Sequence, residues 1–315
     1  MQFDGGPDFS QPVAHNGYTW WYIDALSDDG QRGLTVIAFI GSVFSPYYAR
    51  ARRRGQADPE NHCAINVALY GRGGKRWALT ERGRNDLDRG VNHLQVGPSR
   101  VSWDGTDLII QVDEVTVPLP SRLQGTIRVS PSATTRDAFV LNPRGNHRWR
   151  PIAPYSRVSV DMVKPKLSWR GHGYFDWNAG DTPLENAFVG WTWSRSSGAA
   201  GTTIYYDGER LCGEQFGLAV AIDPKGQVTT VAPPPPTSLP TTTVWRIPRA
   251  TRSDLGTQAR VIETCEDTPF YARSITEATI SGQPVRAMHE SLLLDRFATR
   301  WVQSLLHFRM PRVAR

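Results

Sequence analysis

One acidic residue of the chain lies among aromatic side chains. The segment GHGYFDWNAGDTP at 171–183 places Asp176 between Phe175 and Trp177, with Tyr174 and His172 close by. A carboxyl group surrounded by rings is poorly solvated, and desolvation favours its neutral, protonated form. A carboxylic acid that is neutral at pH 7 can give a proton to a weakly basic substrate, and rings can stabilise the cation that results. The segment therefore predicts acid chemistry, with a solvent-facing Asp in an ordinary strand as the alternative.

A second cluster of similar composition occurs earlier, where NHRW at 146–149 places His147 and Trp149 two residues apart. Alternate side chains of a strand share a face, so His172, Tyr174 and Asp176 are expected on one face of a strand over 172–177. Phe175 and Trp177 are expected on the other face. Each histidine alone is more often structural, so the prediction of a site depends on the combination.

The familiar catalytic and cofactor motifs do not occur in the sequence. There is no GxSxG elbow, HExxH pair or Walker loop, and GHGYFD lacks the third glycine of a dinucleotide fingerprint. The cysteines Cys63, Cys212 and Cys265 are far apart and form no CxxC pair, so neither a zinc site nor a redox pair is indicated. We therefore expect no metal and no cofactor.

The elements that would position these residues are predicted to be strands. The 315 residues include 11 Trp, 10 Tyr and 11 Phe, and such rings favour strands and the walls of apolar pockets. Short β-branched or aromatic runs between turn signals predict about eight strands before residue 131 and about ten after residue 156. The last of them covers 300–309, and no convincing helical stripe precedes residue 280. The pattern is typical of an all-β protein with antiparallel sheets or barrels and little helix.

The segment 131–156 is rich in Pro, Arg and Asn, lacks periodicity, and predicts a long crossing connection. On this interpretation the chain has two β domains, 1–162, which includes the connection, and 163–315. The tract VAPPPPTSLPTTT at 231–243 is an alternative linker, because polyproline is extended and semi-rigid. That boundary would leave a thin second domain, so a surface loop within the second domain is favoured.

Most of the chain resembles one known family. The segments that carry the resemblance are NGYTWWYIDALSDDGQRGLTVIAFIGSVFSPYYARAR at 16–52, GNHRWRPIAPYSRVSVDM at 145–162, LSWRGHGYFDWNAGDTPLE at 167–185, FVGWTWSRS at 188–196 and the region 263–295. They are similar to the carotenoid 1,2-hydratases, or hydroxyneurosporene synthases. The resemblance implies a cofactor-independent hydro-lyase of carotenoid biosynthesis in photosynthetic bacteria. It would add water across the terminal C1=C2 bond of acyclic carotenoids such as neurosporene and lycopene, giving tertiary 1-hydroxy carotenoids. It also implies two lipocalin-like antiparallel β-barrel domains.

The family's HxW pair corresponds to His147 and Trp149, and its YxD pair to Tyr174 and Asp176. We expect Asp176 to protonate C2 of the alkene, which leaves a tertiary cation at C1 facing Trp149 and Tyr174. His147 is expected to take the proton of the attacking water, and the reverse assignment, with His147 as acid relay, stays open.

The polyene must also be held, and Phe175, Trp177 and His172 are expected to contact it. A barrel interior or the cleft between two barrels could supply the long apolar groove that a polyene needs, and the cleft is favoured. Two other functions fit the same scaffold. A non-catalytic carrier of carotenoids or other isoprenoids needs the pocket but not the acid, and a cyclase or pericyclase would give a product of unchanged mass.

Charge and hydropathy suggest where such an enzyme works. The formal net charge is +6, with basic clusters ARARRR at 49–54 and HFRMPRVAR at 307–315, which predict peripheral contact with an anionic membrane. Each cluster alone is also compatible with a solvated loop or a frayed terminus, and nucleic acid is the weaker alternative. The apolar run at 34–44 is too short to span a membrane, and the N-terminus is not typical of a signal peptide. The sparse cysteines favour a reducing, cytoplasmic setting.

Overall fold

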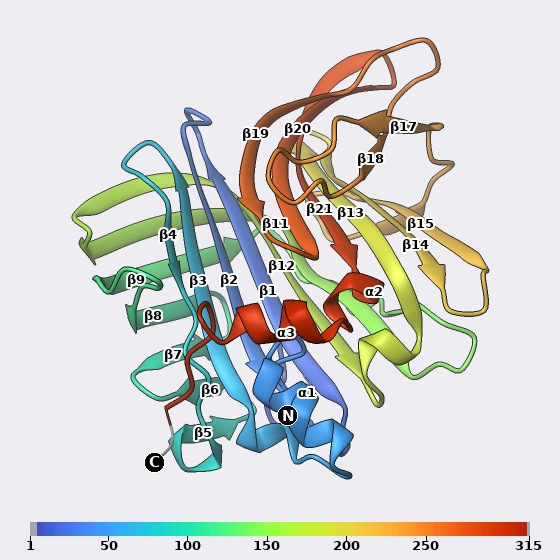
Figure 1. Cartoon of the computed structure of the whole chain (residues 1–315). Helices are drawn as coiled ribbons and strands as arrows, with labels where there is room; N and C mark the ends of the chain where they lie inside the picture. The colour runs from blue at the N-terminus through green and yellow to red at the C-terminus, as the bar shows by residue number, and fades with distance from the viewer. Residues whose placement is uncertain (1–4, 314–315) are drawn as a thin grey trace. The chain divides into compact units, whose positions relative to one another are not determined.

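The computed structural model describes residues 5–313, which form two compact units. Unit 1 runs to Pro183 and takes up the chain again from Gln303, whereas unit 2 is Leu184–Val302. Curled antiparallel sheets make up most of both units (Figure 1), which confirms the predicted lipocalin-like all-β fold class.

Unit 1 is built on a twelve-stranded sheet with the order β4-β3-β2-β1-β12-β11-β9-β8-β7-β6-β5, in which β10 pairs with β11. Its strands are β1 (Tyr18–Ser27), β2 (Arg32–Ile40), β3 (Cys63–Gly71), β4 (Arg76–Ala78), β5 (Leu87–Gly90), β6 (His93–Val96), β7 (Ser99–Trp103), β8 (Leu108–Val115), β9 (Arg122–Pro131), β10 (Phe139–Val140), β11 (His147–Lys164) and β12 (Leu167–Gly180). Consecutive strands pair from β1 to β4 and from β5 to β9, whereas β12 returns to pair with β1.

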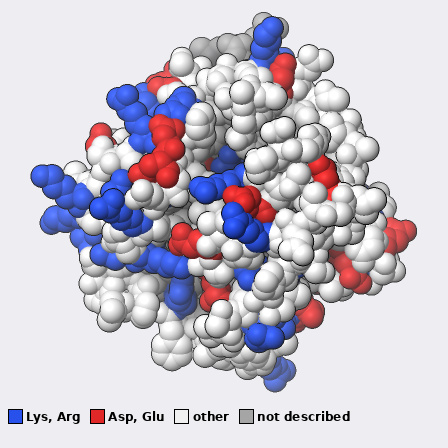
Figure 2. Space-filling view, turned by 90° about the horizontal axis from the view of Figure 1, so that it is seen from above, with Lys and Arg blue, Asp and Glu red and all other residues white. Residues whose placement is uncertain are grey.

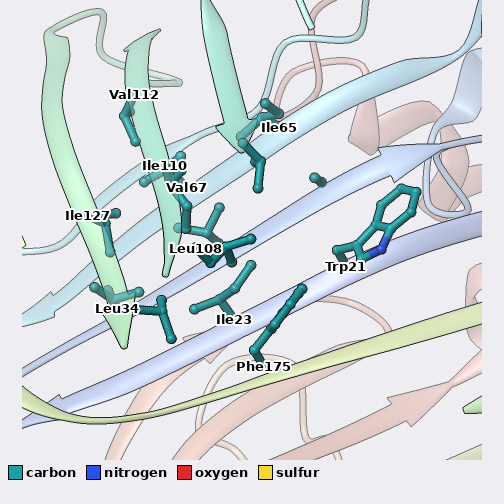
Figure 3. Close-up of a cluster of buried hydrophobic side chains, with 14 of the residues drawn as sticks. Trp21, Ile23, Leu34, Ile65, Val67, Leu108, Ile110, Val112, Ile127 and Phe175 are labelled. Carbon is teal, nitrogen blue, oxygen red and sulfur yellow. The ribbon is translucent and has the colours of Figure 1, made fainter. Parts of the chain in front are cut away.

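One face of this sheet carries the apolar core of unit 1. Alternate residues of β1, such as Trp21 and Ile23, are buried there with Leu34 of β2 and Phe175 of β12 (Figure 3). A fully buried aliphatic or aromatic side chain of this kind contributes about 1.5–3 kcal/mol. The curled sheet is therefore packed with its own side chains where this cluster lies.

The prediction of a structureless connection over 131–156 is wrong at its C-terminal end. β11 begins at His147 and pairs with β12 and then with β9. Its ladder with β12 shifts register between Arg150 and Ala153 and again between Ala153 and Ser156. Pro151 and Pro154 fall within these shifts, where a residue that lacks an N–H is tolerated. The prolines led to the wrong prediction because they occupy the irregular positions of a long strand.

The helices also differ from the expectation. α1 (Pro46–Arg53) follows Ser45, whose hydroxyl accepts hydrogen bonds from the N–H groups of Tyr47 and Tyr48. Its eight residues are too few to show a clear helical stripe. The predicted strand at 300–309 is wrong, because α3 (Arg300–Leu306) occupies this segment. Val302 and Leu306, four residues apart, are buried, whereas Trp301 and Leu305 are exposed, which is a helical period.

Unit 2 contains a seven-stranded antiparallel sheet with the order β16-β15-β14-β13-β21-β20-β19, and a separate hairpin of β17 and β18. Its strands are β13 (Phe188–Gly198), β14 (Gly201–Arg210), β15 (Gln215–Ile222), β16 (Val228–Thr230), β17 (Pro236–Leu239), β18 (Arg249–Arg252), β19 (Arg260–Asp267), β20 (Tyr271–Ile280) and β21 (Gln283–Leu293). α2 (Leu294–Phe297) follows β21, and a short 3₁₀ helix occupies Leu184–Asn186. Two further 3₁₀ helices, Pro59–Asn61 and Arg84–Asp86, belong to unit 1. The Pro-rich tract 231–243 lies within unit 2.

The expected boundary between residues 162 and 163 lies within unit 1, near the turn of the β11–β12 hairpin. Both strands of this hairpin belong to unit 1 because β12 pairs with β1 along its C-terminal part and β11 pairs with β9. The described units divide after Pro183 instead. That the chain consists of two separately folding domains stays a prediction.

Candidate active site

Asp176 lies on β12 with only 3% of its surface exposed, and three side chains donate hydrogen bonds to its carboxyl group. The indole Nε1–H of Trp149 and the hydroxyl of Tyr174 each donate to Oδ2 at 2.8 Å. The amide Nδ2–H of Asn178 donates to Oδ1 at 3.1 Å. A single buried carboxyl is thus fixed by three neutral donors.

The pairing of β11 with β12 explains this arrangement. Side chains alternate along β12, so Tyr174, Asp176 and Asn178 share one face. In the register of the two strands Trp149 is opposite Asn178, and the indole reaches the carboxyl two residues further along β12. On its other side, β12 pairs with β1, which places Tyr22 opposite Asp176.

Tyr174 is completely buried beside Asp176. Burial, together with the neighbouring carboxyl groups of Asp176 and Asp24, raises the pKa of Tyr174 well above its usual value. The phenol therefore stays neutral and remains a donor at physiological pH. Its ring lies edge-on to the ring of Tyr22, with centroids 6.2 Å apart. The acid is consequently set in an aromatic and poorly hydrated environment.

His147 is buried at another place on the same face. Its Nδ1 lies 2.9 Å from the hydroxyl of Tyr18, and its Nε2 lies 3.1 Å from Oγ1 of Thr182. Burial lowers the pKa of His147 to about 4, so the imidazole is neutral at pH 7. In the strand register His147 is opposite Gly180. Gly180 is four residues from Asp176, which is about 13 Å along a strand.

The other expected substrate contacts lie elsewhere. Phe175 is part of the apolar core, on the opposite face of β12 from the Asp176 carboxyl. Trp177 shares that face and donates from Nε1 to Oγ1 of Thr19 at 2.7 Å. The rings adjacent in sequence therefore do not surround the Asp176 carboxyl, because strand geometry turns them away, and Trp149 and Tyr174 surround it instead.

His172 shares the face of Tyr174 and Asp176, as predicted, but lies on the surface. Its side chain is 48% exposed and 3.8 Å from the carboxylate of Asp28. Its ring centroid lies 6.0 Å from that of Tyr155. The substrate contacts predicted for His172, Phe175 and Trp177 stay predictions.

A cavity of about 750 Å³ lies beside β12, and its lining includes Trp177 and Ala179 from the face opposite the Asp176 carboxyl. Trp21, Trp177 and Tyr18 line it, and Arg148 and Arg150 add positive charge. Tyr18 connects this cavity to His147 through the hydrogen bond to its hydroxyl. Among the described residues, no group of three or more His, Cys, Asp or Glu side chains is placed to hold a metal ion.

Sequence reasoning missed several residues of the site. Asn178 could have been found, since it is two residues from Asp176 and therefore on the same face of the strand. Tyr18, Tyr22 and Asp24 had no such signal. They join the site only because β1 pairs with β12, which no local pattern reveals.

Comparisons with known proteins agree on one family. A family model described as carotenoid hydratase CrtC matches residues 36–315. The chain is 56% identical over 308 residues to an acyclic carotenoid 1,2-hydratase of Thiocapsa roseopersicina, covering 98% of this chain and 76% of the relative. It is 48% identical over 319 residues to an acyclic carotenoid 1,2-hydratase of Rubrivivax gelatinosus, covering 98% and 77%.

The fold has counterparts among solved structures. An AttH-like protein of Nitrosomonas europaea superposes with a TM-score of 0.60 at 14% sequence identity. The match covers 89% of this chain and 94% of that protein. At this level of identity the likeness concerns the fold alone.

Proposed function

Since this chain belongs to the carotenoid hydratase family CrtC, we propose that Asp176 is the acid with which it hydrates acyclic carotenoids. The protein is a carotenoid 1,2-hydratase, a hydro-lyase that adds water to the terminal C1=C2 bond. The observation that carries the proposed mechanism is the buried carboxyl of Asp176 with its three hydrogen-bond donors.

An isolated alkene is a very weak base, so its protonation requires a strong acid in a dry site. In the first step the O–H bond of Asp176 breaks, and the π electrons of the alkene form a new C–H bond at C2. The positive charge is left at C1, which carries two methyl groups and is therefore tertiary. This preference for the tertiary cation explains the position of the hydroxyl group without further steering.

The hydrogen bonds explain how one carboxyl can be neutral at rest and yet acidic. Burial favours the neutral form, whereas hydrogen-bond donors favour the carboxylate that remains after proton transfer. A hydrogen bond to a charged group contributes about 1.5–3 kcal/mol, so the donors stabilise the conjugate base as it develops. Oδ2 accepts from both Trp149 and Tyr174 and Oδ1 accepts from Asn178, so both oxygens of the carboxylate are stabilised after proton transfer.

The rings of Trp149 and Tyr174 would also stabilise the cation. A desolvated cation–π contact is worth about 2 kcal/mol, which corresponds to roughly thirtyfold in rate. The role of His147 in activating water stays a prediction. Its two ring nitrogens are engaged by Tyr18 and Thr182, which favours a role in fixing the start of β11.

The replacement Asp176→Asn tests the acid directly. Asparagine keeps a carbonyl oxygen for Trp149 and Tyr174 but has no acidic proton. Hydration of lycopene in detergent should fall about a thousandfold, since general acids contribute 10²–10⁴. Chromatography and mass spectrometry would measure the product that is one water heavier. The surface replacement Asp161→Asn on β11 is the matched control and should leave turnover unchanged.

Each outcome separates the competing functions. If Asp176→Asn hydrates lycopene as fast as the parent, Asp176 is not the acid. A parent protein that binds lycopene and returns it unchanged would be a carrier. A product of unchanged mass would indicate a cyclase or pericyclase.

Peripheral contact with an anionic membrane is the second part of the proposal. No helix within residues 5–313 has the length and apolar character needed to cross a bilayer. In unit 1, α1 presents the exposed side chains of Arg50, Arg53 and Arg54. The segment after α3 presents Phe308, which is 76% exposed. Arginine near an exposed aromatic side chain is a composition typical of interfacial binding.

Two contacts join α1 to the segment 303–307. The ring centroids of Tyr47 and His307 lie 4.8 Å apart, and Arg53 donates to Oε1 of Gln303 at 2.7 Å. Elsewhere on the molecule, Lys and Arg side chains also gather toward one side of the face shown in Figure 2, beside fewer Asp and Glu. Each Lys or Arg near an anionic surface contributes about 1 kcal/mol of attraction.

Flotation with vesicles of anionic lipids tests the membrane proposal. Binding should weaken as salt increases, and the charge reversals Arg50→Glu and Arg53→Glu should reduce it about tenfold or more together. The same replacements should leave turnover in detergent unchanged. Binding that does not respond to salt or to the charge reversals would contradict this proposal.

A further inference from the structure

A second buried carboxyl lies near Asp176 and has no part in the mechanism above. Asp24 is in the middle of β1, and its side chain is completely buried. The register of β1 and β12 places Asp24 directly opposite Tyr174. Asp24 and Asp176 are thus diagonal neighbours on one face of the sheet, a relation in which positions are about 7–8 Å apart.

A buried hydroxyl group lies on the strand position opposite this carboxyl. The register of β1 and β2 places Thr35 directly opposite Asp24, and Thr35 is completely buried. Within the described part of the chain, Oγ1 of Thr35 makes no hydrogen bond. Leaving a buried hydroxyl unsatisfied costs about 1–3 kcal/mol, and such groups are commonly satisfied by a bound water. A water molecule bound between Thr35 and Asp24 would satisfy this hydroxyl.

We propose that Asp24 is the catalytic base that takes the proton from the attacking water, which Thr35 and Asp24 hold. This inference rests on the proposed function, because it assigns the second half of the same reaction. The arrangement suits the role, because diagonal positions on one face of a sheet bring two carboxyl groups to the same site without pairing them directly.

A lone pair of the water oxygen forms the C1–O bond with the tertiary cation. One O–H bond of that water breaks, and its proton passes to the Asp24 carboxylate. Asp176 is left as a carboxylate from the first step, and Asp24 is now neutral, so one proton must return from Asp24 to Asp176.

Tyr174 connects the two acids. Its hydroxyl donates to Asp176 at 2.8 Å, and its residue is the cross-strand partner of Asp24. When the Tyr174 hydroxyl passes its proton to Asp176 and receives one from Asp24, both carboxyl groups regain their starting states. Burial and the two nearby carboxyl groups raise the pKa of Tyr174, so a free phenolate is disfavoured and the two transfers are coupled.

Asp24 suits the base role better than His147 does. Asp24 is a diagonal neighbour of Asp176, whereas His147 is opposite a residue four positions from Asp176 along β12. Both ring nitrogens of His147 are also engaged, by Tyr18 and Thr182. A water held near His147 would therefore lie far from the carbon that receives the hydroxyl group.

Asp24→Asn is the first test, since it keeps the size of the side chain and removes the base. We expect kcat for lycopene hydration to fall about a hundredfold or more, with KM and lycopene binding within about twofold of the parent. Asp28→Asn, a surface change at the end of the same strand, is the control and should leave kcat unchanged. A kcat of Asp24→Asn within about threefold of the parent would overturn the proposal.

Chemical rescue is the second test, because a merely structural role would not show it. Asp24→Gly opens space for a small carboxylate, and added formate should raise its kcat at least about tenfold by replacing the missing base. Folded protein without rescue, or lost lycopene binding without rescue, would make Asp24 a structural residue and overturn the inference. Failure of the parent protein to hydrate lycopene would instead overturn the proposed function.

Discussion

Strand β12 carries Tyr174, Asp176 and Asn178 on one face, and Phe175 and Trp177 on the other. Asp176 and Phe175 are both almost completely buried, yet they meet opposite surroundings. Phe175 packs in the apolar core of unit 1, where dispersion and the hydrophobic effect stabilise the fold. Asp176 accepts three hydrogen bonds. Without its carboxyl group, the three donors would need other acceptors.

The two faces of β12 thus separate buried residues that stabilise the fold from buried residues that serve the reaction. Burial of a polar group costs free energy unless the group is hydrogen-bonded, so a buried polar face stabilises a sheet less than an apolar face of the same size does. Changes on the apolar face should therefore lower stability and leave turnover unchanged, whereas changes on the polar face should lower turnover and leave stability unchanged.

Phe175→Ala should have the largest effect on stability. Removing a fully buried aromatic ring leaves a cavity and is expected to lower the free energy of unfolding by about 3–5 kcal/mol. Urea denaturation measures this loss, and turnover per folded molecule at low temperature should stay near that of the parent. Phe308→Ala, at an exposed position, is the control and should change stability by less than about 0.5 kcal/mol. A loss below 1 kcal/mol for Phe175→Ala would break the comparison of the two faces.

Trp149→Phe should have a smaller effect, and on turnover. The change keeps an aromatic ring but removes the Nε1–H that donates to Asp176, a hydrogen bond worth about 1.5–3 kcal/mol once the carboxylate forms. Steady-state assays should show kcat reduced about 10–100-fold.

Trp177→Phe is the matched change on the opposite face, where the lost N–H donates to Thr19. Its kcat should fall less than about threefold, since no reacting group is near. Equal losses of kcat in the two variants would mean that the hydrogen bond to Asp176 does not matter for the reaction.

The smallest effect is expected in the dependence of stability on pH. Burial lowers the pKa of His147 to about 4, whereas an exposed histidine of the unfolded chain titrates near 6.5. The unfolded chain therefore binds the proton first as pH falls. The stability associated with neutral His147 is present above pH 6.5 and is lost as pH falls toward 4.

His147→Gln should reduce this loss, as measured by urea denaturation at several pH values between about 7.5 and 4.5. The dependence should not disappear, because burial also lowers the pKa of His289, in unit 2, to about 4. His289→Gln should reduce the pH dependence of the free energy of unfolding by a comparable amount. The double variant should show the weakest dependence. An unchanged slope in His147→Gln would mean that its imidazole is solvated in the folded protein.

Local patterns were sufficient for part of the fold and part of the site. Turn residues between short aromatic and β-branched runs predicted eight of the nine strands from β1 to β9 and missed β5 (Leu87–Gly90). Both signals act within a few residues. They failed at 147–156, where Pro151 and Pro154 resemble a connection but occupy register shifts of β11. They also failed at 300–309, where apolar residues of mixed spacing were assigned the period of a strand.

The all-β class, the resemblance to one family, and the common face of Tyr174 and Asp176 could be inferred from local sequence patterns. The alternation of side chains along a strand is a local property, so it needs no knowledge of neighbours. The surroundings of Asp176, in contrast, depend on the folded sheet. Trp149 reaches it through the β11–β12 pairing, Asp24 and Tyr22 join through β1, and Phe175 is turned into the core. Register between strands distant in sequence depends on the packing of the whole sheet, which no short segment specifies.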